Sequence, residues 1–102
     1  MNLEKLVEIG LLFEQYKMLL TDKQQEIVSL YYNEDYSLGE ISENLKVSRQ
    51  GVYDTLKRSE KILREYEAKL GLVAKMKERE RFTQDIYNKV VDIKQDLLQN
   101  RD

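Results

Sequence analysis

The side chains best suited to recognition chemistry lie in one segment, residues 48–64. Arginine and glutamine form paired hydrogen bonds, which suit the edges of guanine and adenine respectively, and lysine or arginine can neutralise phosphates. If this segment is a helix in a major groove, its first residues reach base edges and its later cations contact phosphates. The base-edge candidates are Arg49, Gln50 and Tyr53, and the phosphate candidates are Lys57, Arg58, Lys61 and Arg64. Ser48 or Lys46 could hold a phosphate at the helix start.

A plainer interpretation of the same residues is a solvated helix face. Charged side chains spaced four apart, such as Glu60 and Arg64, commonly pair along an exposed helix. The alternating charges of residues 75–81 are also typical of an exposed surface. Tyr31, Tyr32 and Tyr36 could stack on bases, but tyrosines at this spacing more often fill a small core with the hydroxyl at the surface.

The composition excludes most catalytic and metal chemistry. The chain contains no cysteine and no histidine, which removes disulfides, thiolates, imidazole bases and the usual zinc ligands. Glu34 and Asp35 are adjacent carboxylates, too few for a calcium or magnesium site. We find no nucleophile paired with a base and no phosphate-binding loop. The sequence therefore predicts a binding protein that is not an enzyme and needs no cofactor.

Charge is distributed unevenly along the chain. The 102 residues carry a formal net charge of -2. Residues 1–36 hold three lysines and seven acidic residues, whereas residues 37–64 hold six lysines or arginines and four acidic residues. The basic excess thus lies in the segment that carries the recognition candidates, where it would favour a polyanionic partner.

Helix signals divide the chain around this segment. Apolar residues at roughly helical spacing predict a first helix over residues 3–20 whose apolar side is buried, namely Leu3, Leu6, Val7, Leu11, Phe13, Leu19 and Leu20. Thr21 and Gln24 form a capping box for a second helix, which should turn Ile27, Val28, Leu30 and Tyr31 inward. A second capping box, Ser37 to Glu40, begins a helix of about eight residues that ends near Leu45.

Two longer helices are predicted after that short one. Ser48 can cap a helix whose buried face carries Val52, Leu56 and Leu63, with no strong breaker before Gly71. From residue 72 onward, apolar residues spaced mostly three or four apart predict a last amphipathic helix over residues 72–100. Its apolar stripe must lie against either the first helix of the same chain or the equivalent helix of a second chain.

A resemblance to known helix-turn-helix proteins rests on three segments, LLTDKQ, LYYNEDYSLGEIS and VSRQGVYDTLKRSEKILREYE. Residues 21–63 resemble the helix-turn-helix of bacterial sigma factor region four. The whole chain is similar to the YlxM-like family of helix-turn-helix proteins, which are encoded beside the genes of the bacterial signal recognition particle. The resemblance implies an all-helical, sigma-like fold and a role in regulating, or acting with, the signal recognition particle pathway of protein export.

Two residues depart from the sigma-like pattern. Asp54 places a carboxylate where sigma factors often carry a polar or basic residue that faces DNA, and a carboxylate repels phosphates. Gly51 costs up to about 1 kcal/mol of helix stability relative to alanine, unless something approaches the backbone closely there. The same surface could therefore serve DNA, the particle's RNA or a protein.

We expect a single all-α domain over residues 1–102, with about five helices. It belongs to the winged-helix-like DNA-binding class without a clear wing: residues 21–63 form the helix-turn-helix core, and amphipathic helices flank it. The protein is expected to be cytoplasmic, without membrane insertion, and to form a homodimer. Its expected partners are nucleic acid, either DNA or signal recognition particle RNA, and the particle's GTPase. A protein adaptor of that GTPase, with no sequence-specific DNA binding, is the alternative function.

Overall fold

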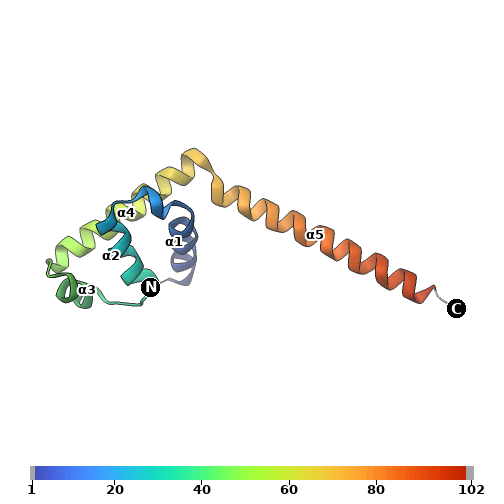
Figure 1. Ribbon diagram of the computed structural model, residues 1–102, viewed down its shortest axis with the longest axis horizontal. Coiled ribbons are helices and arrows are strands. Elements are labelled where there is room, and N and C mark those ends of the chain that lie inside the picture. Colours follow the sequence, from blue (N-terminus) through green and yellow to red (C-terminus); the bar gives the residue numbers. More distant parts are fainter. Residues whose placement is uncertain (1, 101–102) are drawn as a thin grey trace. The chain divides into compact units, whose positions relative to one another are not determined.

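Every regular element that the computed structural model describes, over residues 2–100, is a helix (Figure 1). The prediction of an all-helical fold with about five helices is thus confirmed. Internal contacts divide the chain into two compact units, Met1–Gly71 and Leu72–Asp102. Each unit is described by itself, and the expectation of a single domain over residues 1–102 stays a prediction.

The first unit consists of α1 (Leu3–Tyr16), a short 3-10 helix (Lys17–Leu19), α2 (Asp22–Tyr32), α3 (Leu38–Leu45) and α4 (Arg49–Leu70). Both predicted capping boxes are present. The Thr21 side chain accepts from the Gln24 amide and the Ser37 side chain from the Glu40 amide, and each partner side chain bonds back to the cap residue. These reciprocal bonds satisfy free amides at the helix starts, which is why α2 and α3 begin where the sequence predicted.

The first helix is shorter than predicted. It ends at Tyr16, and the chain tightens into the 3-10 helix before the extended residue Leu20. The buried face of α1 consists of residues spaced three or four apart, namely Ile9, Leu12, Phe13 and Tyr16. Leu3 and Val7 lie on another side of the helix and are exposed, and Leu19 is half exposed on the 3-10 helix. The expectation that these three side chains are buried was therefore wrong.

The core of the first unit forms around α4, which contacts α1, α2 and α3. α4 supplies a continuous buried stripe with the spacing expected of one helix face. Ile27 and Val28 are buried as predicted, whereas Leu30 and Tyr31 are only partly buried and Tyr32 takes the inner position. The buried apolar residues of the unit are Ile9, Leu12, Phe13, Tyr16, Leu20, Ile27, Val28, Tyr32, Ile41, Val52, Leu56 and Leu63.

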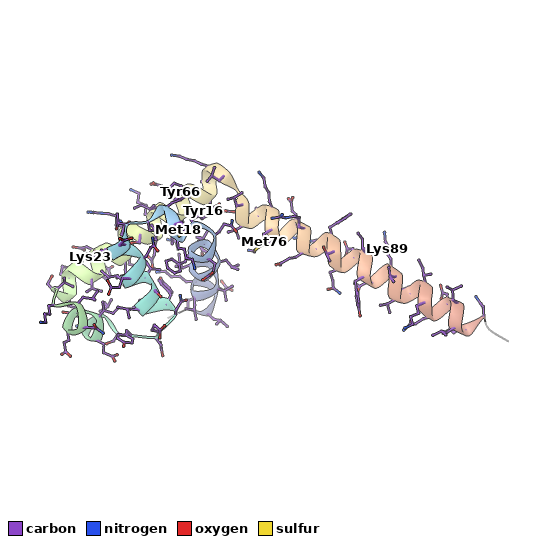
Figure 2. The ribbon with its side chains drawn as sticks, viewed as in Figure 1. Tyr16, Met18, Lys23, Tyr66, Met76 and Lys89 are labelled. Atoms are coloured by element: carbon purple, nitrogen blue, oxygen red, sulfur yellow. The ribbon has the colours of Figure 1, made fainter. Side chains whose placement is uncertain are left out.

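An aromatic contact joins α1 to the C-terminal half of α4. The rings of Tyr16 and Tyr66 stack with their centroids 5.9 Å apart (Figure 2). The buried Tyr16 hydroxyl donates a hydrogen bond of 2.6 Å to the Glu67 carboxylate. Because a buried hydroxyl without a partner would be costly, this bond lets a large aromatic side chain fill the core at the end of α1.

The helix α4 ends where the sequence predicted. Gly71 adopts a left-handed conformation with φ +61° and donates its amide to the Glu67 carbonyl, as expected of a glycine that terminates a helix. The second unit is one continuous helix, α5 (Leu72–Gln99). Among the described residues, none of the helices is both long enough and apolar enough to cross a membrane.

Leu63→Ala tests the α4 core. Leu63 is fully buried, so the substitution should remove about 2–5 kcal/mol from the free energy of unfolding, because it reduces apolar burial and leaves a cavity. Leu70→Ala is the matched control, because Leu70 lies on the same helix but is 46% exposed. Urea unfolding followed by circular dichroism measures both variants. Equal losses from the two would contradict the assignment of Leu63 to the core.

Candidate nucleic-acid interface

The connection between α3 and α4 is a tight turn. Lys46 follows α3 in a left-handed conformation with φ 57°, which reverses the chain within a few residues. The Ser42 hydroxyl donates to the Val47 carbonyl at 2.5 Å, and the Val47 amide donates to the Ser42 carbonyl at 3.2 Å. Ser48 then caps α4 by accepting from the Gly51 amide at 2.9 Å. These bonds fix the point at which the second helix of the helix-turn-helix begins.

The position of Gly51 is explained by this cap. A Cβ atom at residue 51 would lie 3.0 Å from Ser48 Oγ, closer than side-chain contacts normally come. The cap side chain therefore approaches the backbone at the place where the glycine leaves room. The helix stability that glycine costs, about 1 kcal/mol, is of the size that an N-cap contributes. Gly51 weakens the helix but leaves the space that the Ser48 side chain needs to cap it.

The base-edge candidates lie on the first turns of α4. Arg49, Gln50 and Tyr53 are all exposed, as is Asp54. Gln50 Nε2 donates to Asp54 Oδ1 at 2.9 Å, so the carboxylate that departs from the sigma-like pattern holds the glutamine amide. The Lys57 ammonium lies 5.5 Å from the centre of the Tyr53 ring, a cation–π distance. Two of the three candidates are thus held by a neighbour one turn further along.

The phosphate candidates divide into two groups. Lys57 Nζ lies 3.6 Å from Glu60 Oε2, and Arg64 Nε donates to Glu8 Oε1 at 2.9 Å. Arg64 therefore pairs with α1, whereas the sequence had suggested Glu60 as its partner, and the bond to Glu8 raises the pKa of Arg64. Arg58 and Lys61 form no hydrogen bond or ion pair within residues 2–100, and Arg49 is equally unpaired there.

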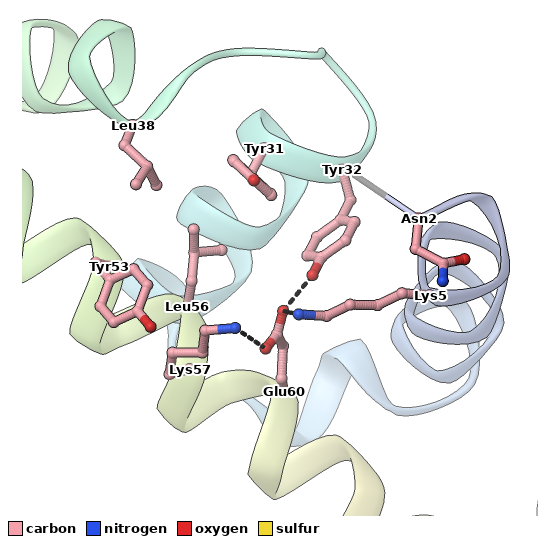
Figure 3. A pocket seen from close by; sticks show the side chains of 9 residues that line it. All are labelled: Asn2, Lys5, Tyr31, Tyr32, Leu38, Tyr53, Leu56, Lys57 and Glu60. Atoms are coloured by element: carbon pink, nitrogen blue, oxygen red, sulfur yellow. Dashed lines mark hydrogen bonds and ion pairs between the residues drawn. The ribbon is translucent and has the colours of Figure 1, made fainter.

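A buried carboxylate lies beside this surface, as Figure 3 shows. The Glu60 side chain on α4 is only 5% exposed. It accepts a short hydrogen bond from the Tyr32 hydroxyl on α2, and the Lys5 ammonium on α1 lies 3.3 Å from its Oε1. With Lys57 beside its other oxygen, Glu60 joins three helices in one cluster, which we call the Glu60 cluster: Lys5, Tyr32, Lys57 and Glu60.

The electrostatics of the Glu60 cluster favour the charged carboxylate. Burial opposes ionisation of Glu60, but the hydrogen bonds from Tyr32 and Lys5 and the charges of Lys5 and Lys57 outweigh it, so the pKa of Glu60 is lowered. Burial, together with the hydrogen bond to Glu60, raises the pKa of the Tyr32 hydroxyl. Tyr32 therefore remains a donor and Glu60 an acceptor around neutral pH.

A cleft of about 330 Å³ opens over the Glu60 cluster (Figure 3). Its lining residues are Asn2, Lys5, Tyr31, Tyr32, Leu38, Tyr53, Leu56, Lys57 and Glu60. Tyr53 and Lys57 thus belong both to the exposed face of α4 and to the wall of this cleft. Nothing in the sequence marks Lys5, and the prediction of Glu60 as a surface charge paired with Arg64 is wrong, because its side chain is only 5% exposed. The spacing did hold a signal, because Glu60 follows Leu56 by four residues and so shares its face of the helix.

Comparison with known proteins assigns the family. Residues 3–101 match the family described as "Putative helix-turn-helix protein, YlxM / p13 like". The chain belongs to this family. The resemblance drawn from the sequence is thereby confirmed, and so is the helix-turn-helix. The sigma factor part of that resemblance is not tested by the match.

Relatives within the YlxM/p13-like family are similar over most of their length. A protein of Limosilactobacillus reuteri is 57% identical over 79 residues, which are 78% of this chain and 70% of that protein. YlxM of Bacillus subtilis is 47% identical over 93 residues, or 91% of this chain and 81% of that protein. A Listeria monocytogenes protein is 54% identical over 82 residues, or 79% and 74% respectively.

Glu60→Gln tests the Glu60 cluster of this YlxM/p13-like protein. The variant should lose roughly 1–3 kcal/mol of unfolding free energy at neutral pH, because a neutral amide loses the ion pairs with Lys5 and Lys57 and weakens the hydrogen bond from Tyr32. Since folding lowers the Glu60 pKa from 4.5, the charged carboxylate stabilises the fold above that pH, and this contribution is lost as pH falls through the folded pKa. The difference between variant and parent should therefore shrink in acid.

Glu65→Gln is the matched control for this experiment, since Glu65 is an exposed carboxylate on the same helix. Denaturant midpoints measured from pH 7 down to pH 3 give both comparisons. A Glu60→Gln loss that stays constant over this range, or that equals the loss in Glu65→Gln, would contradict the electrostatic role assigned to Glu60.

Proposed function

We propose that this protein is a non-enzymatic regulatory protein that binds nucleic acid through the first turns of α4. The observation that carries the proposal is the exposed, capped start of α4, which presents Arg49 and Gln50 directly after the turn of a helix-turn-helix. In helix-turn-helix proteins the N-terminal residues of the second helix contact base edges in the major groove. Membership of a helix-turn-helix family supports the same class of function.

The pairing of the side chains supports this use of α4. Arg49, Arg58 and Lys61 have no partner among residues 2–100, so they can meet bases or phosphates without first breaking an ion pair. Asp54 is engaged by the Gln50 amide, and this bond holds the glutamine in one orientation. We assign base contacts to Arg49, Gln50 and Tyr53, and phosphate contacts to Ser48, Lys57, Arg58, Lys61 and Arg64.

Duplex DNA is the ligand that this geometry favours, because an α-helix fits the major groove of B-form DNA, whereas the major groove of A-form RNA is too narrow for it. A homodimer would present two copies of α4 at a fixed spacing to a twofold-related site. In keeping with the resemblance to YlxM-like proteins, we assign the regulation to the signal recognition particle pathway, with the protein acting in the cytoplasm.

A second candidate function is that of an adaptor for the signal recognition particle GTPase. The specific observation in its favour is the row of exposed apolar side chains on α5, which could pack against a helix of another protein. An adaptor would need no contact between α4 and nucleic acid, so the two candidates differ in a direct binding measurement.

Fluorescence anisotropy makes that measurement. Labelled duplex DNA and labelled signal recognition particle RNA are each titrated with the full chain at several salt concentrations. Micromolar or tighter binding of duplex DNA, weakening linearly on logarithmic axes as salt rises, is the expected result. Tighter binding of the RNA would overturn the choice of DNA. No binding of either at low salt would overturn nucleic-acid binding and favour the adaptor.

The double variant Arg49→Ala/Gln50→Ala should abolish preference among DNA sequences, because it removes the paired donors and acceptors that read base edges. Affinity for the preferred sequence should fall by at least roughly thirtyfold, because two paired base contacts are lost and each contributes about 1–3 kcal/mol of discrimination. Selection from a random duplex library, followed by competition titrations, measures both effects. An unchanged preference would reject the assignment.

Arg58→Ala/Lys61→Ala should instead weaken binding to all sequences about equally, and the salt slope should fall by roughly one for each phosphate that the variant no longer neutralises. Lys69→Ala/Lys75→Ala is the matched control, since both lysines are exposed, lie far along the chain from Arg49, and their loss removes the same two charges. If this control bound as weakly as the first double variant, the loss would reflect net charge alone.

A further inference from the structure

A row of large apolar side chains runs along α5 and is exposed to solvent. The exposed fractions of these side chains lie between 47% and 68%. The row consists of Phe82, Ile86, Val90, Ile93 and Leu97. Figure 2 shows α5 as a single helix with side chains along its length, Lys89 among them. A long helix in water draws most of its stability from packing an apolar face against another apolar surface. We therefore expect this row to pack against a partner.

The spacing of the row identifies the kind of partner. From residue 83 onward, positions spaced alternately three and four apart carry Thr83, Ile86, Val90, Ile93 and Leu97. This is the a/d pattern of a coiled coil, with Ile86 and Ile93 at d positions and Val90 and Leu97 at a positions. The pattern fits another helix with the same repeat, and a second copy of α5 supplies one.

We infer that α5 is a dimerisation helix that pairs with α5 of a second copy in antiparallel orientation. Ile86 lies opposite Leu97 of the second copy, and Val90 lies opposite Ile93. Each layer then combines an a position with a d position, and the same layers recur on both sides of the twofold axis. The inference deepens the proposed homodimer and rests on it.

The charges beside the row determine the orientation. A parallel pair would bring Lys89, at a g position, next to Lys94 of the second copy, at an e position, and like charges there repel. In the antiparallel register Lys89 meets Asp96 of the second copy, and the twofold axis repeats the attraction. Tyr87 meets Lys94 of the second copy, which suits a cation–π contact. The contacts at the g positions and at the e positions therefore both favour the antiparallel pair.

Charge reversal tests the orientation, because the two arrangements predict opposite effects. Lys89→Glu should weaken the antiparallel dimer of the full chain, raising its dissociation constant roughly tenfold, whereas it would tighten a parallel dimer by pairing with Lys94. Lys89→Glu/Asp96→Lys should restore the parent value. Sedimentation equilibrium measures all three proteins, and Lys77→Glu, at an outer position of α5, is the matched control.

Disulfide cross-linking tests the register, and the chain has no cysteine of its own to interfere. An equal mixture of Ile86→Cys and Leu97→Cys proteins should form a heterodimeric disulfide. Neither variant should cross-link to itself. In this register residue 86 lies level with residue 97 of the second copy, so the two cysteines of an Ile86→Cys or a Leu97→Cys pair are roughly 16 Å apart along the axis. Asn88→Cys mixed with Gln95→Cys is the matched control: these residues have the same axial register but face outward, and should stay uncross-linked.

Several results would overturn the inference. A full chain that is strictly monomeric in sedimentation equilibrium would overturn it. The apolar row of α5 would then be assigned to contact with a different protein. A tighter dimer in Lys89→Glu, or self-linking of Ile86→Cys, would establish a parallel pair instead. Nucleic-acid binding is measured separately: Arg49→Ala/Gln50→Ala should leave the dissociation constant of the dimer unchanged. Failure of the α4 proposal and failure of the α5 inference are therefore distinguishable.

Discussion

Glu60 carries a negative charge into the space between α1, α2 and α4, where its side chain is only 5% exposed. A buried carboxylate is tolerated only if it is paired and hydrogen-bonded, and here Tyr32 and two lysines meet that requirement. Lys5 lies on α1 and Tyr32 on α2, so satisfying Glu60 requires both helices to pack beside this part of α4.

The proposed recognition face, formed by Arg49, Gln50, Tyr53, Arg58 and Lys61, lies on the same helix as Glu60. α4 has a buried stripe that holds the core and, on its other side, the cations and the glutamine assigned to nucleic acid. Lys57 belongs to both, since it pairs with Glu60 and lies over the Tyr53 ring. The cap at Ser48 sets where the helix starts and therefore which residues stand at its tip. Core, cap and recognition face are thus parts of one rigid helix.

The sequence predicted the local structure well because caps and glycines act over a few residues. Thr21, Ser37, Ser48 and Gly71 each mark a helix boundary through a hydrogen bond or a backbone conformation that their residue type favours. What depends on distant residues was not predicted. Spacing places Glu60 on the same helix face as Leu56, but it could not show that the carboxylate meets Lys5, which lies far away along the sequence, or that Arg64 pairs with Glu8 on α1.

The start of α4 is the proposed contact with the ligand. Titration of the ¹⁵N-labelled protein with short duplex DNA, followed by two-dimensional NMR, measures this contact, because the spectrum reports on each backbone amide and on the Gln50 side-chain amide. Shifts should concentrate at residues 47–64 and at the Gln50 side chain, while α5 amides stay in place. Shifts confined to α5, or spread without regard to α4, would contradict it.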